Sequence, residues 1–75
     1  MFDKNIFCNR LLQLRKQKNI SQAKLAEIIG ISYHTISKIE NKQRAASIEV
    51  LCALADYFNV SLDYLVGRSD NPERR

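Results

Sequence analysis

Residues 33–41 present hydrogen-bonding side chains along one face of a predicted helix. Ile36 and Ile39 recur at helical spacing and mark the buried side of this helix. The opposite face has no acidic side chain before Glu40, although exposed helix faces commonly carry some. The side chains on that face can hydrogen-bond to the edge of a nucleic acid base or to a phosphate. They are Tyr33, His34, Thr35, Ser37 and Lys38.

A polar, basic segment follows this helix and contains Asn41, Lys42 and Arg44. It belongs to a larger asymmetry of charge. Residues 1–44 hold nine basic and three acidic side chains, a net +6, whereas residues 45–75 hold three and five, a net −2. The asymmetry favours a polyanion as the partner of the first part. The alternative is that lysine and arginine simply solvate the surfaces of helices.

The elements that position these residues are predicted to be helices. Glycine and proline are scarce, with two Gly and one Pro in 75 residues, and apolar residues recur at steps of three and four. We expect an all-α, compact five-helix domain over residues 1–67. Residues 68–75 lack apolar periodicity and are expected to form a flexible tail. The predicted helices cover residues 4–18, 22–29 and 33–41, a segment from a Ser47 cap to about Phe58, and a short segment between Ser61 and Gly67.

The second and third predicted helices have the pattern of a helix-turn-helix over residues 22–41. Ser21 and Ser32 are suitable N-caps, and Gly30 suits the left-handed end of the second helix. Ala26 permits a close crossing, and the isoleucines at 31, 36 and 39 fix its angle. Such a pair projects the outer face of the third helix, which fits a major groove about 12 Å wide.

Several functional classes are not expected. Cys8 and Cys52 have no metal-ligand spacing, and the chain has one histidine, so we predict no metal and no cofactor. Both cysteines are expected to be buried or half-buried apolar groups. His34 has no spaced cysteine or serine partner, so an enzyme is not predicted. No apolar run approaches the roughly 20 residues of a membrane span and no signal pattern begins the chain, which predicts a cytoplasmic protein.

The motif resembles the helix-turn-helix of the Cro and phage-repressor type, also called XRE-like regulators. The resemblance covers residues 6–67 approximately. It is carried by Leu14-Arg15, Ser21-Gln22, Leu25-Ala26, Gly30-Ile31-Ser32, residues 36–41, Leu54-Ala55, residues 60–65 and Gly67.

The resemblance implies a sequence-specific regulator of transcription that binds a two-fold double-stranded DNA operator as a homodimer. A repressor is expected, with an activator as the alternative, because the sign of regulation depends on where the operator lies relative to a promoter. It implies that bases are read by Tyr33, His34, Thr35 and Lys38, and that phosphates are held by Gln22, Ser37, Asn41, Lys42 and Arg44. Gln22 is also placed to brace Tyr33. Tyr33 and His34 stand where small polar residues or glutamines are common in the family, so no operator sequence is inferred.

The resemblance also implies an ion pair between Arg15 and Glu40, partly buried, that orients the third helix. The alternative is two unrelated surface charges.

A second functional class is a protein-interaction module, such as an antitoxin that grips a toxin. It would expose a large apolar patch, and the candidates are Phe2, Tyr57, Tyr64 and Val66. The same residues could equally form the surface of a homodimer. The chain is expected to be either a complete regulator or the DNA-binding part of a longer one, because residues 68–75 resemble the start of a linker.

Overall fold

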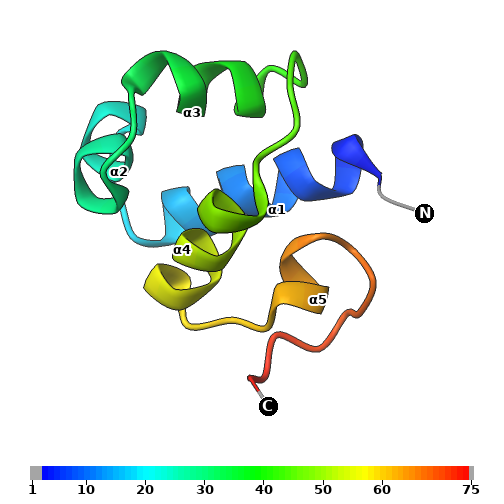
Figure 1. Ribbon diagram of the computed structural model, residues 1–75. Coiled ribbons are helices and arrows are strands. Elements are labelled where there is room, and N and C mark those ends of the chain that lie inside the picture. Colours follow the sequence, from blue (N-terminus) through cyan, green and yellow to red (C-terminus); the bar gives the residue numbers. More distant parts are fainter. Residues whose placement is uncertain (1–2, 75) are drawn as a thin grey trace.

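The computed structural model describes residues 3–74 and folds them into five helices (Figure 1). The predicted all-α, five-helix fold is confirmed, with no strand among these residues. The first and third helices end one residue earlier than predicted, because Lys18 and Asn41 are C-caps. The helices are α1 (Lys4–Gln17), α2 (Gln22–Ile29), α3 (Tyr33–Glu40), α4 (Ile48–Phe58) and α5 (Leu62–Leu65).

Every helix begins after a short side chain whose oxygen accepts a backbone N–H of the first turn. This bond satisfies one of the donors that a helix start leaves without a partner. The caps are Asp3, Ser21, Ser32, Ser47 and Ser61, with donor–acceptor distances of 2.8 to 3.2 Å.

Every helix is followed within two positions by a residue in the left-handed conformation, with φ between 56° and 89°. The N–H of the following residue returns to a carbonyl five residues earlier, as in Gln43 to Lys38, at 2.8 Å. Glycine or asparagine occupies four of these positions, namely Asn19, Gly30, Asn59 and Gly67. The fifth is Lys42, with φ of 65°, a conformation that costs a residue with an ordinary side chain about 1 kcal/mol or more.

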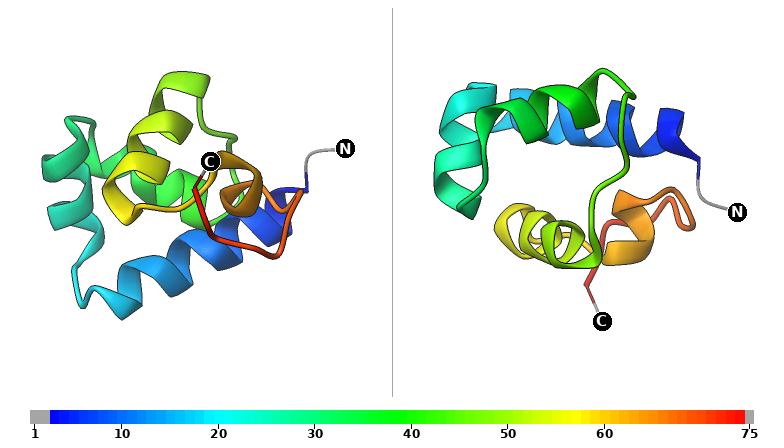
Figure 2. Two further views of the ribbon diagram at one scale, coloured as in Figure 1. Left: turned by 90° about the horizontal axis from the view of Figure 1, so that it is seen from below. Right: turned by 45° about the horizontal axis from the view of Figure 1, so that its top comes forward.

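A single apolar core joins the five helices. The residues predicted to face inward on α1, Phe7, Leu11 and Leu14, are buried, as are Ile36 and Ile39 of α3. In the right-hand view of Figure 2, α1, α2 and α3 lie on one side, and α4 and α5 close the core from the other. Consequently, the outer face of α3 remains free of other helices. None of the helices over residues 3–74 has the length and apolar character needed to cross a membrane.

The two cysteines have different environments. Cys8 is buried, with 3% of its surface exposed. Cys52 is exposed, so the prediction of a buried or half-buried group is wrong for this residue. Leu54, Ala55 and Phe58 fill the inner stripe of α4, and Cys52 falls outside it.

We expect this difference to appear in thiol reactivity. Burial raises the pKa of the Cys8 thiol above its ordinary value of 9.0, which lowers the thiolate fraction. Under native conditions at about pH 8, DTNB should therefore modify Cys52 rapidly and leave Cys8 unmodified until urea unfolds the chain. The change Cys52→Ala serves as the control and should remove the rapid phase. Two rapid thiols in the folded protein would contradict the burial of Cys8.

The segment 68–74, for which the sequence predicts a flexible tail, turns back against α4 and α5 (Figure 1). Arg74 donates to the Ala55 carbonyl at 3.1 Å and to the Asp56 carboxylate at 2.6 Å. The N–H of Ser61 donates to the Pro72 carbonyl at 2.9 Å. These contacts are polar, so no apolar periodicity in the sequence accompanies them.

The two glycines offer a matched test of backbone conformation against packing. An added Cβ at Gly67 would lie 2.5 Å from Cγ2 of Ile6, whereas nothing lies within 4 Å of one at Gly30. Both residues have positive φ. Gly30→Ala should therefore lower the free energy of unfolding by about 1 kcal/mol through strain alone. Gly67→Ala should lower it by about 3 kcal/mol, because the clash adds to the strain. Equal losses in urea denaturation would contradict the close approach of Ile6 to Gly67.

Candidate nucleic-acid interface

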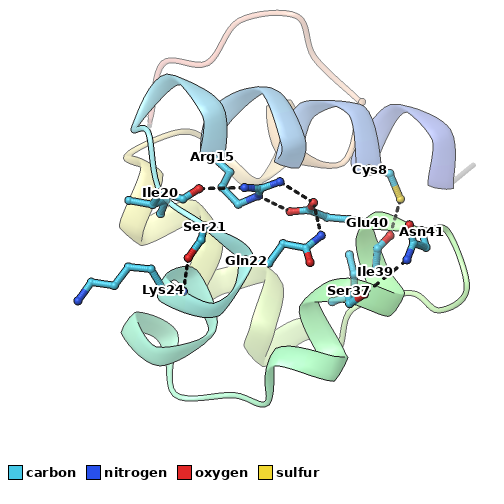
Figure 3. Close-up of polar contacts among 10 residues, drawn as sticks. All are labelled: Cys8, Arg15, Ile20, Ser21, Gln22, Lys24, Ser37, Ile39, Glu40 and Asn41. Carbon is cyan, nitrogen blue, oxygen red and sulfur yellow. Dashed lines mark hydrogen bonds and ion pairs between the residues drawn. The ribbon is translucent and has the colours of Figure 1, made fainter.

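The carboxylate of Glu40, at the end of α3, is the point where three helices meet (Figure 3). Nε of Arg15 lies 2.8 Å from Oε2 of Glu40, and Nη2 lies 3.0 Å from Oε1. Nη1 of the same guanidinium donates to the Ile20 carbonyl at 2.9 Å. The ion pair that the sequence predicts is thus present and two-pronged. It is also largely buried, since 14% of the Arg15 side chain and 5% of the Glu40 side chain are exposed.

Gln22 completes this anchor. Its Nε2 donates to Oε1 of Glu40 at 2.9 Å, so α2 is attached to the same carboxylate as α1 (Figure 3). For Gln22 the family resemblance implies a phosphate contact and a brace for Tyr33, but it does not imply this bond. The Tyr33 ring packs edge-on against His34, with 5.6 Å between the centroids. Gln22 and Glu40 are 18 positions apart, and no local spacing signals their contact.

The outer face of α3 carries the predicted base-reading residues. Tyr33 has 47% of its surface exposed, and His34 and Lys38 are also exposed. Thr35 and Ser37 are half-buried at the margins of this face. Ser32 caps the helix by accepting the N–H of His34 at 3.0 Å, which fixes the start of the face. The structure therefore brings the predicted readers together on one exposed surface.

The predicted phosphate-binding residues after α3 form a compact turn over residues 41–44. All four of its residues are exposed. Nδ2 of Asn41 lies 3.4 Å from Oγ of Ser37, and the N–H of Lys42 donates to the Ile39 carbonyl at 3.1 Å. Together with the left-handed Lys42, these bonds direct the chain sharply away from α3. No local pattern predicts this conformation, because lysine does not favour it.

Part of the positive charge counted in residues 1–44 is already paired within the fold. Arg10 belongs to the basic part of the sequence, but it stacks on the Tyr64 ring at 4.2 Å and pairs with Asp70 at 2.7 Å. The charge of Arg15 is neutralised by the ion pair with Glu40. Within residues 3–74, no ion pair involves the cations of α3 and the turn. These cations are Lys38, Lys42 and Arg44.

Comparisons with known proteins agree with this geometry. Residues 11–65 match the helix-turn-helix family. The chain is 35% identical over 68 residues to the uncharacterized HTH-type transcriptional regulator YobD of Bacillus subtilis (strain 168), covering 91% of this chain and 61% of that protein. It is 42% identical over 60 residues to the HTH-type transcriptional regulator AnsR of the same organism, covering 80% of this chain and 52% of that protein.

Among solved structures, the fold is similar to the P22 c2 repressor in complex with synthetic operator 9T, with a TM-score of 0.79 and 31% identity. The match covers 85% of this chain and 97% of that chain. The chain spans between half and two thirds of the length of the two curated regulators, at 52% and 61%. These relatives are regulators of transcription, in agreement with the prediction of a non-catalytic protein. The chain therefore belongs to the helix-turn-helix family, and its fold is of the phage-repressor type.

Proposed function

We propose that this chain is a repressor that places α3 in the major groove of a double-stranded operator. The observation that carries the proposal is the exposed outer face of α3, free of acidic groups and held rigidly through Glu40. A fixed helix with hydrogen-bonding side chains can discriminate base pairs, because each pair has its own pattern of donors and acceptors in the major groove. The proposed base contacts come from Tyr33, His34, Thr35 and Lys38.

The proposed phosphate contacts surround this face. Lys42 and Arg44 supply charge in the turn after α3, and Ser37 and Asn41 supply hydrogen bonds beside it. Gln22 stands at the first position of α2, where its amide retains one N–H beyond the bond to Glu40. Such contacts fix the register of the protein on the duplex, and the base contacts give sequence preference.

The size of the domain supports binding as a homodimer. The described chain measures 27 × 22 × 21 Å. Successive major grooves on one side of a duplex are about 34 Å apart, which exceeds its longest dimension. One copy can therefore reach one half-site only, and a two-fold operator is bound by two copies. The similarity to a repressor in complex with a synthetic operator supports binding to an operator.

Selection from random duplexes at one fixed salt concentration tests this proposal. We expect two inverted half-sites whose centres are about 10 base pairs, or a multiple, apart. The spacing would report the symmetry and geometry of the dimer. Failure to enrich any sequence would contradict specific binding, and a single unpaired half-site would contradict the dimer.

The alternative of a protein-interaction module receives less support. Of its proposed patch, Tyr57, Tyr64 and Val66 are half-buried, with both tyrosines packed against the core, and Phe2 lies outside the described residues. Among residues 3–74, the large apolar side chains that are exposed, apart from Tyr33, lie on three different helices. They are Ile6 of α1, Ile28 of α2 and Ile48 of α4.

A further inference from the structure

Cys8 contacts the end of α3 from the neighbouring helix α1. Its Sγ donates to the Ile39 carbonyl oxygen at 2.7 Å, across 31 positions of the sequence (Figure 3). Arg15 lies two turns further along α1 and binds Glu40, the residue after Ile39. The end of α3 is therefore attached to α1 at two points, one through a side chain and one through a backbone carbonyl.

The Ile39 carbonyl that Cys8 contacts also accepts a hydrogen bond from the turn over residues 41–44. Ile39 accepts the N–H of Lys42 at 3.1 Å, and this bond closes the turn in which Lys42 is left-handed. The Cys8 thiol is a second donor to the Ile39 carbonyl, and it restricts the orientation of that carbonyl. The thiol of Cys8 is thus one bond removed from a strained residue to which the proposed function gives a phosphate contact.

The environment of Cys8 keeps the thiol able to donate. Burial raises its pKa above the ordinary value of 9.0, so that the thiol is protonated at neutral pH. Only 3% of the residue is exposed, and water does not compete strongly for the Ile39 carbonyl. Cys52, the other cysteine, is exposed on α4 and provides a matched comparison.

We propose that Cys8 is a positioning residue for DNA binding, holding the Ile39 carbonyl so that the turn over residues 41–44 keeps Lys42 and Arg44 at the phosphates. The proposal rests on the proposed function. A thiol is a weak donor, so the expected effect is modest and specific to the turn.

The variants Cys8→Ala and Cys8→Ser separate donation from packing. Serine keeps a donor, whereas alanine keeps an apolar group without one. We expect Cys8→Ala to weaken binding to a selected duplex about threefold and to flatten its salt dependence. Cys8→Ser should bind like the parent chain, and Cys52→Ala should have no effect. In a Lys42→Gln/Arg44→Gln background, Cys8→Ala should have no further effect on affinity, because the contacts that it positions are already absent.

A second measurement needs no DNA. Hydrogen exchange at the amide of Lys42 should be faster in Cys8→Ala than in the parent chain, and restored in Cys8→Ser. Equal exchange in all three proteins, equal loss of affinity in both backgrounds, or a serine variant no better than alanine would overturn the proposal. If the parent chain itself fails to bind duplexes, the proposed function fails, and exchange at Lys42 alone decides whether Cys8 holds the turn.

Discussion

Replacing Arg15 with methionine is expected to lower the free energy of unfolding by about 3 kcal/mol. The change leaves the Glu40 carboxylate, 5% exposed, with Gln22 as its remaining side-chain donor. A buried charge without its counter-ion is unfavourable, because the surrounding protein does not replace the water that the carboxylate gave up. Urea denaturation of the folded domain measures the loss by linear extrapolation.

Three comparison variants make this result specific. Glu40→Gln should cost less, because Arg15 is more exposed than Glu40 and keeps its bond to the Ile20 carbonyl. The double variant Arg15→Met/Glu40→Leu should recover most of the loss, since it removes both charges together. Lys24→Gln breaks the 4.0 Å pair with Glu27 on the surface of α2 and should change stability by less than about 0.5 kcal/mol. A loss for Arg15→Met no larger than that of Lys24→Gln would show that the buried pair does not hold α3.

The sequence predicted the helical framework because its signals are local. Asp or Ser precedes each helix, and the three- and four-residue spacing of residues such as Phe7, Leu11 and Leu14 identifies the core. The motif over residues 22–41 could also be placed from Ala26 and Gly30, whose roles depend on their immediate neighbours. The resemblance to known regulators then paired Arg15 with Glu40, which spacing alone does not do.

The parts of the site that the sequence did not predict depend on contacts between distant segments. The bond from Gln22 to Glu40 requires α2 and α3 to be in place, and the bond from Cys8 to Ile39 requires α1 and α3. The left-handed Lys42 is imposed by the bonds of its turn against the preference of the residue. The polar contacts of Arg74 likewise hold a segment that has no apolar pattern.

Neutralising the turn after α3 is expected to have the largest effect on DNA binding. Lys42→Gln/Arg44→Gln removes two exposed cations that form no ion pair within residues 3–74. If each cation neutralises one phosphate, the slope of log K against log salt should fall by about two per protomer, with a 10- to 100-fold loss of affinity at about 0.1 M salt. Fluorescence anisotropy with a labelled duplex at several salt concentrations measures both quantities.

The matched control variant removes two positive charges at positions outside α3 and its turn. Lys16 is an exposed residue of α1 beside Asn9 and Gln13. Arg68 is an exposed residue after α5, a helix that lies across the core from α3 (Figure 2). Lys16→Gln/Arg68→Gln should leave the slope within about half a unit of the parent value, because neither side chain flanks the recognition helix. If net charge alone attracted the duplex, the two double variants would lose equal affinity. A larger loss for the turn variant would instead show that the cations beside α3 contact phosphates.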